Sequence, residues 1–342
     1  MAHRGPYRVP GLIQAAQYVP RESSLTIARN ATIEDQPFPQ EVDATTFAEA
    51  IAWANNPTSF CFQASSLRAH VSSLAIVTVS QNLEHNVTVA IHTNRLLLAL
   101  EQNARYCHFI SMDPTRAVHW TKILAVKQAL ALSPYVLWLD ADAVIARFDV
   151  PVLQRLLSLS ASKDVLFSSE FNQPRNATDA SIDATQASVR INTGAVFFKS
   201  SEFTFQFLDS VYKEAPKWTY WLMEKDQSGF DYWQQAHSAE WLEHMRVVHY
   251  RYMNSFGEKY KEGDLVYHVA GGIHNLNKFD TVLERCRQFN CRSRLWKGQC
   301  TYHPSLAANG TIPKVDVASV ITSTAVRVWK ASGITQSQRV NP

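Results

Sequence analysis

Short apolar runs alternate with longer amphipathic segments along most of the chain. Apolar runs bounded by turn signals are typical of buried strands, whereas apolar residues at helical spacing indicate helices. The short runs predict strands at residues 73–80, 106–110, 135–139, 164–169, 194–199, 246–250 and 265–270. Helical spacing predicts helices at residues 87–104, 119–132, 151–160, 202–214 and 280–289. Strands that alternate with helices in this way favour an α/β fold with a mostly parallel sheet.

The two ends of the chain and one internal stretch do not follow this pattern. Residues 1–70 carry several prolines, so we expect an irregular N-terminal extension with a helix near Thr46–Asn55. The polar residues 170–190 predict a surface loop or flap, and residues 301–342 predict a peripheral C-terminal tail. One large domain is therefore expected at residues 71–300.

The strand predicted at residues 135–139 ends in two aspartates, Asp140 and Asp142. Alternate residues of an extended chain share a face, so both carboxylates can point at one place. Unpaired carboxylates at the end of a buried strand are costly, and a divalent cation is a favourable partner for two of them. The alternative is one solvated aspartate and one helix cap. Ligands of α/β sheets bind beyond the carboxyl ends of strands, which favours the metal.

His268 lies in another apolar strand, and Gly271 and Gly272 follow it. A histidine in such a strand is usually a core residue. Two glycines, however, allow the backbone to approach a ligand closely. Two carboxylates and one imidazole suit Mn²⁺ and leave positions for diphosphate oxygens. Such a metal would act as a Lewis acid on a leaving diphosphate.

Composition narrows the classes of protein to consider. The chain has 342 residues, 46% of them hydrophobic and 18% charged, which is enough for a large core and argues against disorder. A net charge of +3 without any cluster of Lys and Arg argues against a nucleic-acid partner. No apolar stretch is long enough for a transmembrane helix, and the N-terminus lacks the apolar region of a signal peptide. A secretory role would therefore need a targeting segment that this sequence does not show.

The cysteines and glycosylation signals bear on the compartment. A disulfide bond among Cys286, Cys291 and Cys300 is compatible with an oxidising compartment, and an unpaired set is the alternative. Cys61 and Cys107 complete the five cysteines. Their spacing does not match a zinc site. Four acceptor sequences for N-glycosylation begin at Asn30, Asn86, Asn176 and Asn309 and favour a lumenal location.

Five motifs together resemble glycosyltransferase family 34, which includes fungal galactosyl- and mannosyltransferases and plant xyloglucan xylosyltransferases. The motifs are HWTKI (119–123), YVLWLDADAVI (135–145), RINTGAVFFKSSEF (190–203), EKDQSGF (224–230) and YKEGDLVYHVAGG (260–272). They occur in the order seen in the family, and the resemblance covers residues 73–290. It implies a GT-A fold, with a single mixed, mostly parallel sheet and helices on both faces. It also implies a nucleotide-sugar donor, Mn²⁺ and retention of the anomeric configuration.

The resemblance assigns roles to particular residues. Asp140, Asp142 and His268 match the metal ligands. The donor contacts that it implies are Thr78, Ser80, Lys122, Asp140, Ala141, Asn192 and Gly271. Lys122 would contact the diphosphate, although an exposed helix lysine is the alternative. Asn192 would face a sugar, or else form a turn before its strand.

Asp226 and Gln227 match an acidic pair beside the reacting carbon. Asp226 would stabilise positive charge on the sugar, and Gln227 would position it. The alternative for both is capping of a helix.

The sequence departs from the family pattern at three places. Glu170 and Asn172 would have to replace a D-x-N element, and Ile273 stands where the family commonly has a phosphate-binding lysine. His274 or Lys278 would have to take that role. Lys225 also stands where some members have an acidic residue.

The motifs together predict a Mn²⁺-dependent retaining hexosyltransferase that uses UDP-Gal or GDP-Man and a glycan acceptor. The aromatic residues of 218–233 are candidates for the acceptor platform. The resemblance also implies a Golgi location and association with itself or with other transferases. The alternatives are a glycogenin-like retaining transferase of the same fold and a weakened, glycan-binding partner subunit.

Overall fold

The computed structural model describes residues 40–44, 59–64, 73–81, 83, 85–170, 189–215, 225–270 and 278–293. All of them belong to one compact unit that begins at Phe38. Several predicted features lie outside the described residues: the helix at Thr46–Asn55, most of the flap at 170–190, the tail at 301–342, and the glycosylation signals at Asn30, Asn176 and Asn309. Asn172, Gly271, Gly272, Ile273, His274 and Cys300 lie outside them as well.

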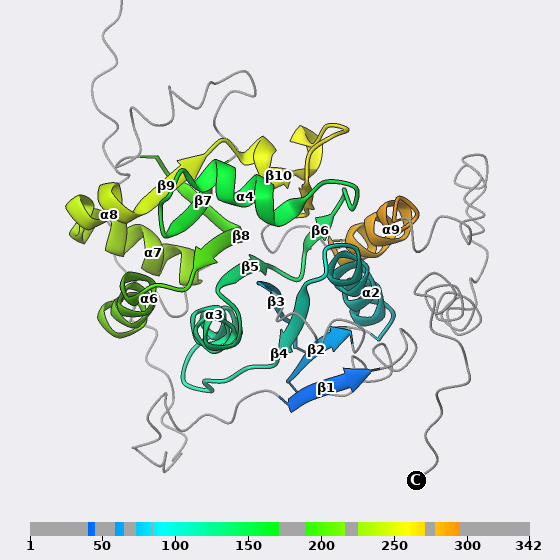
Figure 1. Ribbon diagram of the computed structural model, residues 1–342, viewed down its shortest axis with the longest axis horizontal. Coiled ribbons are helices and arrows are strands. Elements are labelled where there is room, and N and C mark those ends of the chain that lie inside the picture. The colour runs from blue at the N-terminus through cyan, green and yellow to red at the C-terminus, as the bar shows by residue number, and fades with distance from the viewer. Residues whose placement is uncertain are drawn as a thin grey trace, which may run out of the picture. The chain divides into compact units, whose positions relative to one another are not determined.

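A large mixed sheet forms the centre of the described part of the chain (Figure 1). Its eight strands run in the order β1-β2-β4-β3-β5-β8-β7-β9. Their bounds are β1 Gln40–Ala44, β2 Phe60–Ala64, β3 Leu74–Val79, β4 Arg105–Phe109, β5 Tyr135–Leu139, β7 Val165–Ser169, β8 Ile191–Lys199 and β9 Met245–Val248. β3 is parallel to β4 and β5, whereas β8 is antiparallel to both of its neighbours. The predicted mixed α/β fold class is confirmed.

A second, smaller sheet adds to the single sheet that the resemblance implies. It contains β10 Ser255–Phe256, β11 Val266–His268 and β6 Ala143–Ile145, in that order. β6 directly follows the Asp140–Asp142 turn, and its three residues are too few for a recognisable pattern. The antiparallel pairing of β11 with β6 sets His268 opposite Ala143. The second sheet thereby links the two halves of the predicted metal site.

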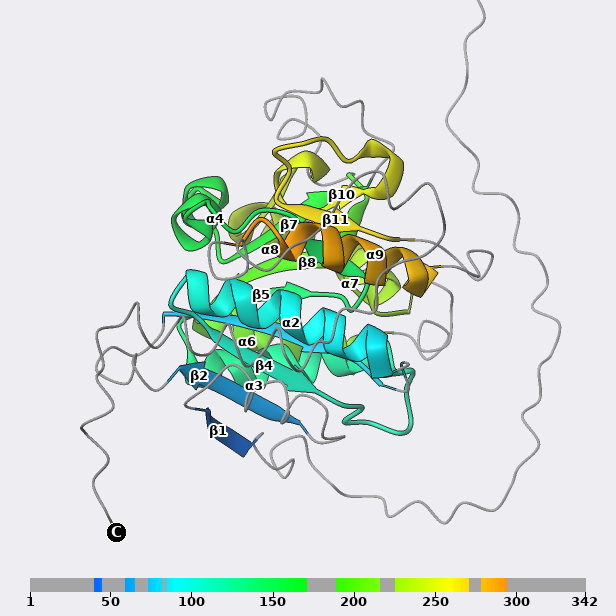
Figure 2. The ribbon, with the colours of Figure 1, turned by 90° about the vertical axis from the view of Figure 1, so that its right-hand side faces the viewer.

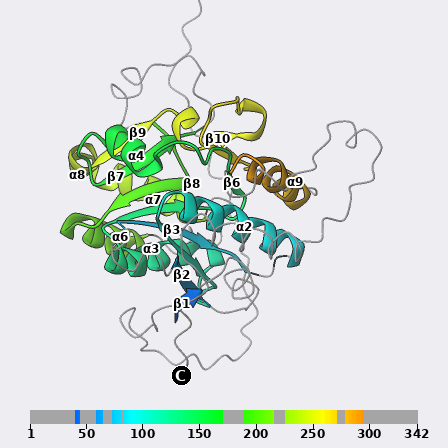
Figure 3. The same cartoon turned by 45° about the vertical axis from the view of Figure 1, so that its right-hand side comes forward.

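Helices cover both faces of the large sheet (Figure 3). One face carries α3 Thr121–Leu132, α6 Glu202–Glu214, α7 Lys225–Ala236 and α8 Ser238–His244. The other carries α2 His85–Glu101 and α4 Val152–Ser160. α9 Lys278–Asn290 lies against α2 and against β6 of the second sheet. Figure 2 shows α2 and α9 side by side, and the two helices pack against each other. No helix among the described residues is both long and apolar enough to cross a membrane.

The central strands are buried because both of their faces are covered. Ile76 of β3, Leu137 of β5 and Phe197 of β8 have no exposed surface. This coverage explains why the sequence shows continuous apolar runs there rather than alternation. The polar groups at the carboxyl ends of these strands are therefore held by a rigid, close-packed base.

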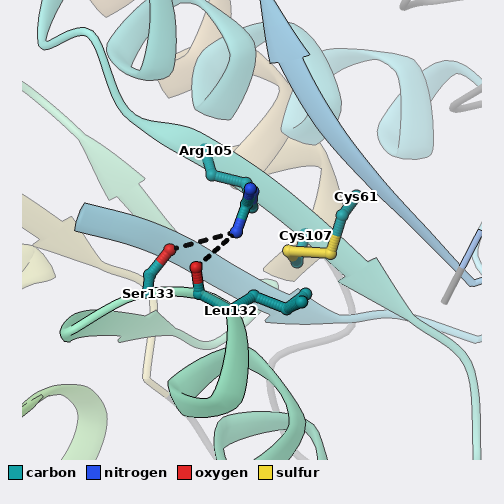
Figure 4. The surroundings of a disulfide bond; sticks show 5 residues. All are labelled: Cys61, Arg105, Cys107, Leu132 and Ser133. Atoms are coloured by element: carbon teal, nitrogen blue, oxygen red, sulfur yellow. Dashed lines mark hydrogen bonds between the residues drawn. A yellow bond between two sulfur atoms is a disulfide. The ribbon is translucent and has the colours of Figure 1, made fainter. Parts of the chain in front are cut away.

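β1 and β2 extend the sheet into the segment for which the sequence predicts an irregular extension. β2 pairs antiparallel with β4, and Cys61 lies directly opposite Cys107. The two residues form a disulfide bond (Figure 4). Beside it, Arg105 donates hydrogen bonds to Leu132 O and to Ser133 Oγ. The disulfide bond joins β2 covalently to β4, so this edge of the sheet is part of the domain.

The sequence left open whether Cys286, Cys291 and Cys300 include a disulfide bond or are all unpaired. Cys291 is also disulfide-bonded, whereas Cys286 is a buried free thiol. Burial raises the pKa of Cys286 to about 12, so this thiol stays protonated and unreactive at neutral pH.

The Cys61–Cys107 bond should contribute substantially to stability. It closes a loop with a sequence separation of 46 residues, for which chain entropy gives about 4 kcal/mol. We expect the double variant Cys61→Ser/Cys107→Ser to lose about 2–4 kcal/mol in urea unfolding. Cys286→Ala, which removes a free thiol, is the control and should lose less. A double variant as stable as the parent would contradict this expectation.

Candidate functional site

Asp140, Asp142 and His268 converge at the carboxyl end of β5. Asp140 follows the last residue of β5, Asp142 lies in the turn before β6, and His268 ends β11. One ligand atom from each of the three residues lies within 4.8 Å of the other two. His268 Nε2 is 3.3 Å from Asp142 Oδ1, and Val269 N donates to Asp142 O at 2.9 Å. The pairing of β11 with β6 thus assembles the cluster that the sequence predicts.

The surroundings of this cluster fit a divalent cation. The buried Nδ1 of His268 has no hydrogen-bond partner within the described part of the chain. Asp140 Oδ1 is oriented by Trp138 Nε1, which donates to it at 2.7 Å. Two carboxylates and an imidazole supply oxygen and nitrogen donors that suit a divalent cation. The donor set and the fixed orientation of its members therefore match a metal site.

Gly194 of β8 makes room for the imidazole of His268. A Cβ atom at residue 194 would lie 2.1 Å from His268 Cε1 and 2.6 Å from its Nδ1. No side chain fits at that distance, so the glycine of the RINTG motif is required by packing rather than by backbone conformation. Gly194 O also accepts a hydrogen bond from Asp140 N at 2.8 Å. β8 therefore supports both halves of the cluster.

Lys122 connects the metal cluster to the predicted catalytic pair. Its side chain is 2% exposed and its Nζ lies 3.1 Å from Asp140 Oδ1 and 2.6 Å from Asp226 Oδ2. Nζ also donates to Thr193 O at 2.9 Å and to Thr193 Oγ1 at 3.1 Å. Burial acts to lower the pKa of Lys122, but the charges and hydrogen bonds of Asp140 and Asp226 outweigh it, and the pKa is raised. Lys122 is therefore a buried, charged bridge between the two aspartates.

This position bears on the predicted diphosphate contact of Lys122. An ammonium group has three donors, and four acceptor atoms already lie within reach of this one. A phosphate oxygen could be bound only if one of these bonds were given up. The alternative of an exposed helix lysine is wrong, because the side chain is buried.

Asp226 and Gln227 lie in the first turn of α7 and face β8. Asp226 Oδ2 accepts from Thr193 Oγ1 at 3.1 Å, in addition to its bond from Lys122. Gln227 Oε1 accepts from Thr193 N at 3.3 Å. Asp226 thus contacts β8 and Lys122, and Gln227 contacts β8. The motifs did not predict a role for Thr193. The only signal for it was its place between Asn192 and Gly194.

Trp120 packs against Gly229 of α7. A Cβ atom at Gly229 would lie 2.5 Å from Trp120 Cη2, so the helix approaches the indole as closely as a glycine permits. Gly229 belongs to the EKDQSGF motif and Trp120 to HWTKI. The two motifs therefore meet in space.

Asn192 and Glu170 extend the polar network away from the metal cluster. Glu170 Oε1 accepts from Gln227 Nε2 at 3.0 Å and from Asn192 Nδ2 at 3.3 Å. Asn192 Oδ1 accepts from Gly194 N at 2.9 Å and from Asn254 Nδ2. Glu170, which follows β7, thus lies against Asn192, the predicted sugar-facing residue.

The other predicted donor contacts differ in how deeply they are buried. Thr78 is fully buried, and its Oγ1 donates to Leu139 O at 2.9 Å. Ser80 Oγ is 2.8 Å from His108 Nε2. Ala141 is partly exposed in the turn between Asp140 and Asp142, whereas Gly271 lies outside the described residues. Thr78 is placed to support the turn, and Ser80 and Ala141 lie nearer the surface.

The packing of His268 against β8 gives a direct test of this geometry. We expect Gly194→Ala to displace the imidazole and to weaken Mn²⁺ binding by at least about tenfold, measured by isothermal titration. Gly257→Ala is the matched control, because a Cβ there first meets Tyr267 Oη at 3.3 Å. Equal Mn²⁺ affinity in both variants would show that Gly194 does not position His268.

Comparisons with known proteins add to this geometry. Two solved structures are similar: a glycosyltransferase involved in the glycosylation of the major capsid of PBCV-1, and mouse xyloside xylosyltransferase 1 in its apo form. The first is 15% identical, covers 63% of this chain and 98% of its own, and has a TM-score of 0.44. The second is 11% identical, covers 60% and 98%, and has a TM-score of 0.39. The comparison with curated proteins gave no match.

The family match extends over most of the described domain. The model of the galactosyl transferase GMA12/MNN10 family matches residues 72–276, which is more than half of the chain. The matched range includes Lys122, Asp140, Asp142, Asp226 and His268. This chain therefore belongs to the galactosyl transferase GMA12/MNN10 family, the glycosyltransferase family 34 that its motifs resemble, and it is a glycosyltransferase whose described residues form a mixed α/β fold.

Proposed function

We propose that this glycosyltransferase moves galactose or mannose from UDP-Gal or GDP-Man to a hydroxyl group of a glycan, with retention of configuration. The observation that carries the proposal is the convergence of Asp140, Asp142 and His268, joined through Lys122 to Asp226. The site thus combines a place for a cation with a carboxylate a short distance away. Family membership supports the donor class and the retaining outcome.

Asp140, Asp142 and His268 would hold Mn²⁺. When bound, the ion would supply Lewis-acid stabilisation of the diphosphate. Trp138 and Lys122 orient Asp140 from one side, and Gly194 fixes the imidazole from the other. This preorganisation means that the side chains need little rearrangement to bind the donor, which is how electrostatic stabilisation becomes effective.

Asp226 would stabilise positive charge on the sugar as its bond to the diphosphate breaks. Its Oδ2 is held by Lys122 and Thr193, while no described residue donates a hydrogen bond to its Oδ1. Gln227 would position Asp226 and the sugar through its bonds to Thr193 and Glu170. The acceptor hydroxyl would attack from the face that the diphosphate leaves, directly or through a short-lived covalent intermediate.

The cysteine chemistry supports a secretory compartment, with the Golgi lumen as the proposed location. Disulfide bonds persist in oxidising compartments and are rare in the cytosol. Cys61 and Cys107 are joined, and Cys291 is disulfide-bonded as well. The family membership of the chain supports the same pathway.

A donor screen with Asp142→Asn tests the proposed function. We expect the parent protein to hydrolyse UDP-Gal or GDP-Man with Mn²⁺, and the variant to lose about a hundredfold or more of that activity. Isothermal titration with UDP and GDP should show Mn²⁺-dependent binding in the parent alone.

Asp149→Asn is the matched control. Asp149 is exposed and paired with Arg147, so the same substitution there removes only a surface ion pair. Activity equal to that of the parent in Asp142→Asn would remove the metal assignment. No metal-dependent nucleotide binding in the parent would overturn the enzyme proposal.

Asp226→Asn should separate chemistry from donor binding. We expect kcat to fall by about 10²–10³ while Mn²⁺-dependent nucleotide binding stays within about twofold of the parent value. The asparagine keeps hydrogen-bonding capacity but lacks the charge that would stabilise the sugar. Asp209→Asn is the control, because Asp209 pairs with Lys127, which is on the same helix as Lys122, and with Lys213, and neither partner is a site residue. An unchanged kcat in Asp226→Asn would contradict the role.

A further inference from the structure

Helix α2 buries four polar residues in succession. His92, Thr93, Asn94 and Arg95 are each at most 4% exposed, although the residues around them in the helix are mostly apolar. Burying a guanidinium group is costly unless its hydrogen bonds are satisfied. The identity of its partners therefore indicates what Arg95 stabilises.

Arg95 binds the backbone on both sides of Asp142. Its Nη2 donates to Asp140 O at 3.1 Å and to Ala143 O. Its Nε donates to Thr78 Oγ1 at 3.3 Å, and that hydroxyl in turn donates to Leu139 O. Because Ala143 N also donates to Asp140 O at 3.0 Å, the guanidinium joins the two ends of a tight turn.

Asn94 fixes the strand that follows the turn. Asn94 Oδ1 accepts from Ile145 N at 2.9 Å and Asn94 Nδ2 donates to Ile145 O at 3.1 Å. Asn94 Oδ1 also accepts from Arg95 Nη1 at 2.6 Å. Two adjacent side chains of α2 therefore hold the backbone from the end of β5 into β6.

The charge of Arg95 is also informative. Among the described residues no carboxylate forms an ion pair with it, and all of its partners are neutral oxygens. Burial lowers the pKa of Arg95, and Asp142 and Asp140 are among the nearby groups that act against this shift. A buried cation behind two carboxylates offsets part of their mutual repulsion before any ligand is bound.

We propose that Arg95 is a positioning residue that holds the Asp140–Asp142 turn in its metal-binding conformation. It acts through backbone carbonyls and touches none of the three proposed ligand atoms. This inference rests on the metal site of the proposed function. It adds a residue outside the five motifs, on a helix that those motifs do not include.

Mn²⁺ titration of metal-free Arg95→Gln tests the proposal without relying on activity. Glutamine cannot span both carbonyls and lacks the charge, so we expect the dissociation constant for Mn²⁺ to rise at least about tenfold. Arg95→Lys retains the charge but not the planar fork. It should recover part of the affinity and should remain measurable if Arg95→Gln fails to fold.

Arg105→Gln is the matched control. Arg105 is also buried and also donates to a carbonyl, that of Leu132, beside the disulfide bond (Figure 4). We expect this variant to lose thermal stability while its Mn²⁺ affinity stays within about twofold of the parent value.

The outcomes separate this inference from the proposed function. Parent-like Mn²⁺ affinity in Arg95→Gln, or an equal loss in Arg105→Gln, would overturn the role of Arg95 alone. If the parent binds no Mn²⁺, the metal site fails and this inference fails with it.

Discussion

The site depends on one buried ammonium group. Lys122 lies between Asp140 and Asp226. Asp140 follows β5 and Asp226 lies in α7, and the two carboxylates would repel each other without the lysine. Breaking a buried ion pair by removing one partner commonly costs about 3–5 kcal/mol, because the other charge is left uncompensated. Lys122 therefore cannot be treated as a substrate contact alone. It holds the β5 end, β8 and the start of α7 at a fixed separation, and the polar network of the site follows from that separation.

The glycines of the motifs serve close packing more than flexibility. Gly194 admits the imidazole of His268, and Gly229 admits the indole of Trp120. In both cases the glycine stands where a large ring must approach the backbone. One contact lies at the metal cluster and the other lies within α7. Motifs that are distant in the sequence are thus parts of one packed arrangement.

Much of the fold could be predicted from the sequence, because buried strands and amphipathic helices have distinct local patterns. The apolar run before Asp140 and the one around His268 indicated strands, and both form as β5 and β11. The features that escaped prediction depend on long-range contacts. β6 is too short to show a pattern, and the bridging role of Lys122 depends on Thr193 and Asp226, which lie far along the chain. Arg95 could have been noticed, since a polar run in an apolar helix is unusual, but its partners are backbone carbonyls that no sequence pattern marks.

The pairing of β11 with β6 also has a consequence for biogenesis. Asp140 and Asp142 are synthesised long before His268, and the strand that carries His268 must reach back to β6 to complete the cluster. α9 then packs against α2 and β6 behind it. During translation the cation site would therefore be completed late, once β11 has paired with β6. Occupancy of that site would report that the chain has been made and folded through β11.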